Sequence, residues 1–231
     1  MNLIRKSAPK FRANAVINGK QIVEKFGLDQ YLGRKNGILF FYPKDFSSIC
    51  QIKIRGFQEK PWEFEKRESI VTGYSADSEE THLACLDTCL AKGGIKGITF
   101  PLIADVSKTI ALNYGILGAE YAYENEKKVW SFNGVPVALR STFLIDKDGI
   151  IRHQTINDFS FEKNADEYLY LIDALYLVKK MVKNVLHICR NGMRKLHYHL
   201  KMAMNILFII SLTFFNWPNP NIEDYSSFVE N

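Results

Sequence analysis

The sequence predicts an α/β protein in which a mixed central sheet is flanked by helices. Short apolar runs alternate along the chain with segments of helical periodicity, a pattern typical of strands covered by helices. Asp148-Gly149 lies between two apolar runs and is a strong hairpin signal, which indicates that part of the sheet is antiparallel. Of the 231 residues, 47% are hydrophobic, which is enough for one sizeable core.

The first predicted strand covers residues 37–42, a short and continuously apolar run. Pro43 ends this strand, and we expect a loop to follow it. After Cys50 the apolar residues recur at helical spacing, so the loop should lead into a helix that Pro61 kinks or stops.

The middle of the chain continues the alternation. Residues 69–75 are predicted as a second strand, and residues 79–91 as a helix capped by Ser78, with acidic residues in its first turn. Residues 105–114 are predicted as a shorter helix. The polar segment 118–136 is predicted to be a surface loop inserted between this helix and the sheet.

Two further strands are predicted over residues 140–146 and 150–157, joined at the Asp148-Gly149 turn. A helix over residues 165–183 follows them. Strands that alternate with helices and include one hairpin indicate a thioredoxin-like fold.

The charge pattern, the N-terminal sequence and the cysteines indicate which partners and which cellular compartment to expect for this protein. The net charge is +5, yet Lys and Arg are interleaved with Asp and Glu, so we predict no nucleic-acid surface. The N-terminus lacks the apolar core and cleavage site of a secretory signal, so we expect a cytoplasmic protein. In that reducing compartment, the four cysteines are expected to be free thiols, metal ligands or redox catalysts rather than permanent disulfides.

An apolar stretch over residues 202–215 marks the C-terminal end. It is shorter than the roughly 20 residues that span a bilayer and contains Asn205 and Ser211, so a packed or disordered tail is favoured over a membrane anchor. We therefore predict a thioredoxin-like domain over residues 1–178 and a divergent C-terminal arm over residues 179–231.

Cys50 lies where the predicted loop enters its helix, with Pro43 and the hydroxyl of Ser47 before it. Free backbone N–H groups and the positive end of the helix dipole stabilise an anion there. A cysteine at this place is held partly as thiolate, the reactive form. The alternative is a small apolar core residue, the more common role for a single cysteine in apolar surroundings.

The segment around Cys50 is one of several stretches that match a known family. These stretches are residues 8–11, 40–50, 75–78 with 82–84, 93–95, 100–105, 137–146, and 157–158 with 164–167. Pro43, Ser47 and Cys50 complete the pattern Pro-x-x-x-Thr/Ser-x-x-Cys. Over residues 3–178 the chain thus resembles the typical two-cysteine peroxiredoxins, especially the small subunit of bacterial alkyl hydroperoxide reductase in the thiol-specific antioxidant family.

The resemblance implies a thiol peroxidase that reduces hydrogen peroxide and alkyl hydroperoxides without a metal or cofactor. Cys50 would be the peroxidatic residue, whose thiolate attacks a peroxide oxygen and becomes a sulfenic acid. Ser47 would hydrogen-bond the peroxide, and Pro43 would shield the sulfenate. Arg140 would stabilise the thiolate and the departing oxygen; the alternative for Arg140 is a strand residue in a structural ion pair.

The resemblance also implies a resolving thiol, for which Cys189 is the candidate. It would form a disulfide with the sulfenate across a homodimer, which can assemble further into a decamer. A thioredoxin-like protein or a flavoprotein disulfide reductant would then recycle the enzyme. In the family this cysteine opens a Cys-Pro-x-x-Trp segment, whereas residues 190–193 here are Arg-Asn-Gly-Met.

Two lysines depart from the family pattern. Lys53 stands where the family carries a Glu that orients the active-site arginine, and Lys163 stands where it carries a second arginine. Loss of the carboxylate should misposition Arg140 and slow peroxide reduction. The alternative function is therefore a catalytically impaired scaffold or holdase of the same family.

Cys85 replaces a Trp that the family prefers, and it lies between His82 and Cys89 on one predicted helix face. These three residues could be metal ligands, but no fourth ligand is evident in the sequence. We interpret the two cysteines as buried or half-buried thiols.

The residues after Cys189 allow a hypothesis about the gene. With suitable codons for residues 188–199, one nucleotide inserted after the Cys189 codon changes the reading to Ile-Cys-Pro-Glu-Trp, which resembles the family's resolving segment. A frame shift here would explain the apolar C-terminus. Gene sequencing tests this, because codons that cannot yield Cys-Pro-x-Trp in the neighbouring frame exclude it.

Overall fold

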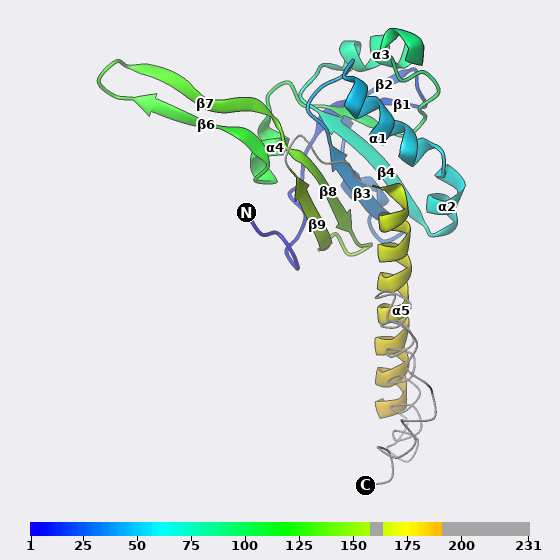
Figure 1. The fold of residues 1–231 in the computed structure, drawn as a ribbon. Helices are drawn as coiled ribbons and strands as arrows, with labels where there is room; N and C mark the ends of the chain where they lie inside the picture. Colours follow the sequence, from blue (N-terminus) through cyan, green and yellow to red (C-terminus); the bar gives the residue numbers. More distant parts are fainter. Residues whose placement is uncertain (158–163, 191–231) are drawn as a thin grey trace, which may run out of the picture. The chain divides into compact units, whose positions relative to one another are not determined.

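The computed structural model describes residues 1–157 and 164–190, and Figure 1 shows its elements. The chain divides into two compact units, Met1–Asp173 and Ala174–Asn231. The first unit holds the described strands and helices up to the first turns of the last helix, and it contains Pro43, Ser47, Cys50 and Arg140, whereas Cys189 lies in the second.

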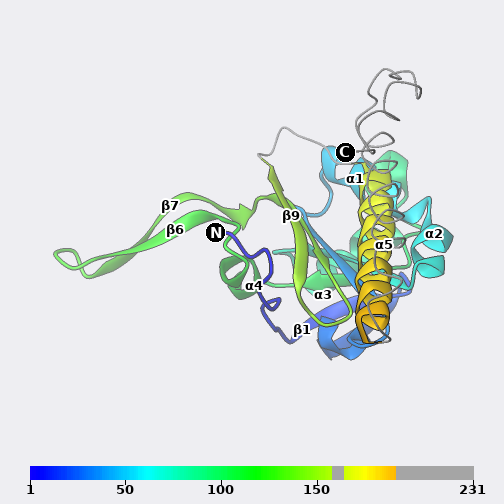
Figure 2. The ribbon, with the colours of Figure 1, turned by 90° about the horizontal axis from the view of Figure 1, so that it is seen from below.

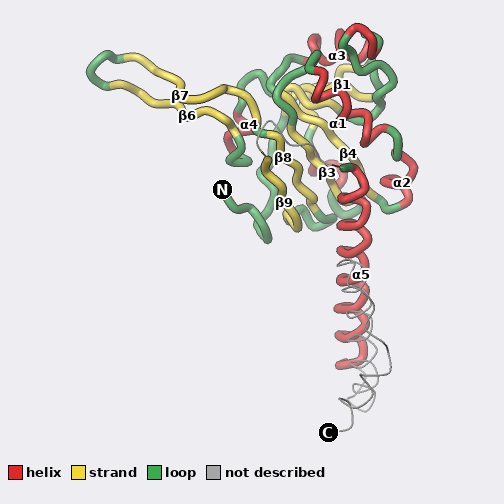
Figure 3. The backbone as a smooth tube through the Cα atoms, in the orientation of Figure 1, coloured by secondary structure: helices red, strands yellow, loops and turns green. Residues whose placement is uncertain are grey.

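The main sheet of the described residues has seven strands in the order β2-β1-β5-β4-β3-β8-β9, drawn in yellow in Figure 3. The central strands β3, β4 and β5 are parallel to one another, whereas β1, β2, β8 and β9 pair antiparallel with their neighbours. The bounds are β1 Ala13–Ile17, β2 Gln21–Phe26, β3 Asn36–Phe41, β4 Ser69–Ser75, β5 Leu102–Ala104, β8 Arg140–Ile145 and β9 Ile151–Asn157. The predicted mixed sheet is thus confirmed.

Helices cover both faces of this sheet. Phe40 and Phe41 are neighbours in β3 and therefore point to opposite faces. Phe40 stacks on Phe57 of α1 with ring centroids 4.8 Å apart, whereas Phe41 lies 5.4 Å from Tyr114 at the end of α4. Figure 2 shows α1 and α4 on different sides of the sheet. The helix bounds are α1 Ser48–Gln58, α2 Pro61–Lys66, α3 Glu79–Asp87, α4 Thr109–Asn113 and α5 Ala165–Arg190, with short 3-10 turns η1 Leu28–Tyr31 and η2 Leu90–Lys92.

The predicted helix over residues 79–91 is shorter in the structure. Ser78 caps α3 as predicted, because its side chain accepts a hydrogen bond from the Thr81 N–H at 3.3 Å. The helix ends at Asp87, where the backbone becomes extended at Thr88. The reason is the tight return of the chain, since a Cβ atom on Gly94 would lie only 2.0 Å from the Thr88 carbonyl oxygen.

The segment predicted as a surface loop forms a two-stranded hairpin, which extends away from the main sheet in Figures 1 and 2. Its strands are β6 (Leu117–Glu124) and β7 (Val129–Ala138). Aromatic residues occupy paired positions, with Tyr121 opposite Phe132 and Tyr123 opposite Trp130. Such residues favour strands, and this preference prevails over the polar turn sequence between them.

The last helix, α5, runs to Arg190 and so exceeds the predicted end at residue 183. Its first turns are held against the domain by ion pairs. Lys60 binds Asp166, and Arg67 reaches both carboxylate oxygens of Asp173 at 2.8 and 2.9 Å. Among the described residues, no helix has the length and apolarity needed to cross a bilayer.

Candidate active site

The structure places Cys50 in the first turn of α1, directly after the loop that follows β3. Ser47 is the N-cap residue of this helix, and the first helical hydrogen bond runs from the Gln51 N–H to the Ser47 carbonyl at 3.1 Å. The backbone N–H groups of residues 48–50 therefore have no acceptor within the helix. They lie at its N-terminus, which is the positive end of the helix dipole. This local environment favours an anion.

Two groups with predicted roles lie on the same loop. Pro43 and Ser47 are both partly buried. Ser47 has an extended backbone with φ −97° and ψ 122°, and its side chain does not cap the helix. The Ser47 hydroxyl is therefore able to bind a ligand instead of a backbone N–H.

Strand pairing brings Arg140 to this loop. Strands β3 and β8 are antiparallel, with Phe40 opposite Thr142. Arg140 is the first residue of β8, so it lies beside the point where β3 ends and the loop begins. Only 4% of Arg140 is exposed. The structure thus gathers Pro43, Ser47, the Cys50 turn and Arg140 at one end of the sheet.

The two cysteines of the α3 region have different environments. Cys85 is buried under the loop, and burial is the main cause that raises its pKa to about 11. Its thiol is therefore protonated and unreactive at neutral pH. Cys89 is exposed. The described residues contain no group of three or more His, Cys, Asp or Glu side chains arranged to hold a metal ion.

A buried polar network supports the loop, and sequence reasoning did not find it. Asp45 accepts a hydrogen bond from the Tyr42 hydroxyl at 3.0 Å and lies 2.7 Å from His82 Nδ1. These residues belong to the loop and to α3, which are far apart in the sequence. The available signal was an acidic residue in the loop together with a histidine on the buried face of a helix.

Comparison with known proteins identifies the family of this chain. The model of the AhpC/TSA family matches residues 4–154. The chain belongs to the AhpC/TSA family. It is 40% identical over 173 residues to alkyl hydroperoxide reductase C of Helicobacter pylori, covering 75% of this chain and 80% of that protein.

Two solved structures show the same relationship for this AhpC/TSA member. The reduced 2-Cys peroxiredoxin of Plasmodium vivax has a TM-score of 0.68 at 34% identity, covering 78% of this chain and 85% of that chain. Plasmodium yoelii Prx1a, modified at its N-terminus and described as forming an artifactual octamer, has a TM-score of 0.64 at 37% identity, covering 75% and 91%. The predicted peroxiredoxin class of enzyme and the thioredoxin-like fold are confirmed.

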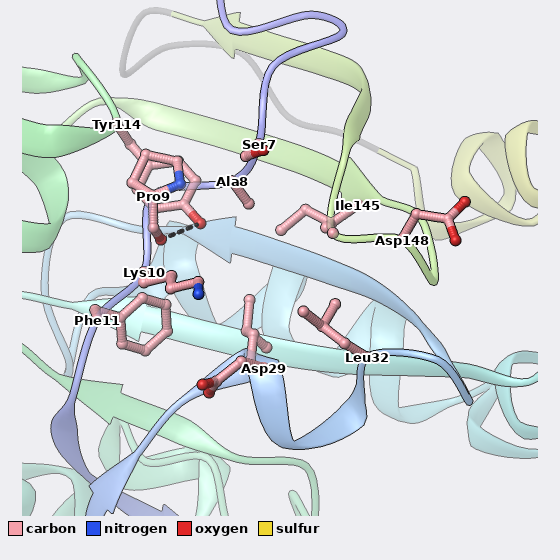
Figure 4. A pocket seen from close by; sticks show the side chains of 12 residues that line it. Ser7, Ala8, Pro9, Lys10, Phe11, Asp29, Leu32, Tyr114, Ile145 and Asp148 are labelled. Atoms are coloured by element: carbon pink, nitrogen blue, oxygen red, sulfur yellow. Dashed lines mark hydrogen bonds between the residues drawn. The ribbon is translucent and has the colours of Figure 1, made fainter.

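A cavity of about 260 Å³ in this AhpC/TSA member lies away from Arg140. Figure 4 shows its lining, including Asp148 and Tyr114, whose hydroxyl donates to the Pro9 carbonyl at 3.3 Å. Asp148 follows the far end of β8, whereas Arg140 begins that strand. The cavity is therefore separate from the candidate active site.

Three other residues with predicted roles lie in the second unit of the chain or, wholly or in their side chains, outside the described part. Cys189 lies near the end of α5, in the second unit of the chain. Lys53 belongs to α1, but its side chain lies outside the described part, and Lys163 is outside the described residues altogether. The predicted effect of these two lysines on Arg140 therefore remains a prediction.

Proposed function

We propose that this AhpC/TSA member is a thiol peroxidase that reduces hydrogen peroxide and alkyl hydroperoxides at Cys50. The observation that carries the proposal is the placement of Cys50 in the first turn of α1, at the sheet end where Arg140 begins β8. The match to alkyl hydroperoxide reductase C supports the same reaction.

The first step is nucleophilic attack by the Cys50 thiolate on the terminal oxygen of the hydroperoxide. An S–O bond forms and the O–O bond breaks, so the sulfur is oxidised by two electrons and the peroxide is reduced by two. The departing oxygen takes a proton and leaves as water or alcohol. The N–H groups at the start of α1, which have no acceptor within the helix, and the guanidinium of Arg140 stabilise the thiolate and the charge on that oxygen.

The loop residues prepare the peroxide for this attack. In the proposal the Ser47 hydroxyl, which makes no capping hydrogen bond, binds the peroxide oxygen. Pro43 shields the reacting sulfur from water. No metal or cofactor takes part, because the thiolate is both nucleophile and electron donor.

The second step regenerates the thiol. The Cys189 thiolate attacks the Cys50 sulfenic acid, an S–S bond forms, and the hydroxyl group leaves as water after protonation. We place this disulfide between two copies in a homodimer, from which a decamer can be built. The Plasmodium yoelii relative, described as forming an artifactual octamer when modified at its N-terminus, supports association of copies but not their number. A thioredoxin-like protein or a flavoprotein supplies the two electrons that reduce the disulfide, and we place the reaction in the cytoplasm.

Mass spectrometry after one equivalent of hydrogen peroxide tests both steps. We expect the wild-type chain to form a Cys50–Cys189 disulfide between copies. The variant Cys189→Ser should instead accumulate the Cys50 sulfenic acid, trapped by dimedone. Dimedone labelling or a disulfide at Cys85 or Cys89, with Cys50 unmodified, would contradict the proposal.

A further inference from the structure

Residues 42–47, which join β3 to α1, are anchored from the inside of the protein by Asp45. The Asp45 side chain is 1% exposed. One carboxylate oxygen accepts a hydrogen bond from the Tyr42 hydroxyl at 3.0 Å, and the backbone N–H of Asp45 donates to the Asp77 carboxylate at 2.7 Å. The middle of the loop is therefore tied to the loop's first residue, directly after β3, and to the segment after β4.

The next residue, Phe46, has a left-handed backbone with φ +53°. This conformation is unfavourable for a bulky side chain and persists only where neighbouring contacts enforce it. Phe46 is 46% exposed, so its own side chain supplies little packing to hold this conformation. The contacts that hold the strained loop are therefore those made by the neighbouring Asp45.

His82 completes the anchor from α3. Its side chain is fully buried, with Nδ1 2.7 Å from the second Asp45 oxygen and Nε2 3.2 Å from the Ile103 carbonyl oxygen. A carbonyl oxygen can only accept, so Nε2 carries a proton. The Asp45 carboxylate requires a donor as well, and an imidazolium satisfies both partners at once.

We propose that His82 is a positioning residue for peroxide reduction, which acts as an imidazolium that fixes Asp45 and, through it, the loop carrying Pro43 and Ser47 into the Cys50 turn. This inference rests on the proposed function, because it concerns the same reaction. His82 does not touch the peroxide; it holds in place the groups that do.

The charges around His82 favour its protonated form. Burial lowers the pKa of His82, but the hydrogen bond and charge of Asp45, with the charge of Asp77, raise it above its usual value. The charge of Glu79 on α3 also acts on His82, and from β5 the Ile103 carbonyl oxygen faces its Nε2. Tyr42 and Cys85 face the same network as neutral groups, because burial raises both of their pKa values.

This charge balance fixes the direction of the pH effect. The pKa of His82 is higher in the folded chain than in the unfolded chain, where it is about 6.5. The interaction of its imidazolium with Asp45 is therefore fully present below the unfolded pKa and is lost as the pH rises through the folded pKa. The loop should therefore lose its anchor on the alkaline side of that value. Peroxide reduction should fall there even though more Cys50 is ionised.

The test compares two second-order rate constants of the reduced full-length chain, one for hydrogen peroxide and one for iodoacetamide at Cys50. Iodoacetamide reports accessible thiolate, so the ratio of the constants isolates peroxide activation. In His82→Ala we expect the ratio to fall about 10- to 100-fold, as displacement of reacting groups by about 1 Å predicts. In His82→Asn, which retains a neutral donor toward Asp45, we expect partial recovery and no fall of the ratio on the alkaline side.

Two further variants provide an independent test of the Asp45 network and a control for replacing a histidine. Tyr42→Phe removes one hydrogen bond to Asp45 and should lower the ratio about threefold to tenfold even if His82→Ala does not fold. His153→Asn is the matched control, because His153 lies on β9 beside Thr155, outside the network, and should retain the wild-type ratio.

The outcomes separate this inference from the function beneath it. A wild-type ratio in folded His82→Asn and Tyr42→Phe, with the alkaline fall retained in His82→Asn, overturns the positioning role and leaves the peroxidase intact. A wild-type chain that reacts with peroxide no faster than free cysteine overturns the proposed function and the positioning role together.

Discussion

Replacing Cys50 with serine is expected to abolish peroxide consumption. A serine hydroxyl at this position is not ionised at neutral pH and cannot accept the peroxide oxygen, so neither the attack nor the sulfenic acid is possible. The substitution is nearly isosteric in the first turn of α1, and the fold should be retained. Consumption of hydrogen peroxide in the presence of dithiothreitol measures the effect.

Cys89→Ser is the matched control for this experiment. Cys89 is an exposed thiol at the N-cap of η2 and has no part in the proposed reaction. The control variant should consume peroxide at the wild-type rate. Turnover that survives in Cys50→Ser and disappears in Cys89→Ser would assign the reaction to Cys89 and refute the proposed site.

Arg140→Met is expected to slow the peroxide reaction by about 100- to 1,000-fold, the range for loss of a preorganised group that stabilises developing charge. Methionine keeps the aliphatic length of a side chain that is 4% exposed, so packing changes little. Arg140→Lys should recover only part of the rate, because an ammonium group lacks the planar, two-pronged donor geometry of guanidinium. Stopped-flow mixing with hydrogen peroxide measures the rate constant.

Arg12→Met controls for the loss of a cation. Arg12 forms an ion pair with Asp29 at 2.5 Å and its side chain is 53% exposed, so its removal should leave the rate unchanged. Equal rates in wild type and Arg140→Met would show that Arg140 has the alternative role of a structural strand residue.

Local signals allowed the sequence to predict the elements that carry Cys50. The apolar run before Pro43 is long enough to identify a buried strand, and the structure has β3 over Asn36–Phe41. Pro61 cannot continue a helix, and it begins α2 after α1 has ended at Gln58. Both boundaries depend on residues adjacent in sequence, which is why they could be read without the fold.

Elements that depend on distant contacts were not predictable in the same way. Strand β5 has only the residues Leu102–Ala104, too few for a periodic pattern, and it exists because it pairs with β4 and β1. The sequence predicts a loop in place of the β6–β7 hairpin, because the polar turn residues outweigh the strand preference of aromatic residues whose pairing is visible only in the fold.

The candidate active site likewise combines residues predictable from local sequence with residues whose positions depend on distant contacts. The spacing of Pro43, Ser47 and Cys50 is local and visible in the sequence. The position of Arg140 depends on the antiparallel register of β8 with β3, and the pairing of Asp45 with His82 depends on how α3 packs. Only the resemblance to a family suggested Arg140, and nothing suggested the buried pair.

The ionisation of Cys50 at neutral pH is the claim on which the mechanism depends, and residue-resolved alkylation measures it directly. The reduced chain is treated with iodoacetamide from pH 4 to pH 11, and mass spectrometry quantifies the alkylated fraction of each cysteine. We predict a midpoint for Cys50 well below the ordinary thiol value of about 8.5, while Cys85, with its pKa raised to about 11, stays unmodified at neutral pH. A Cys50 midpoint at or above the ordinary value would contradict the account.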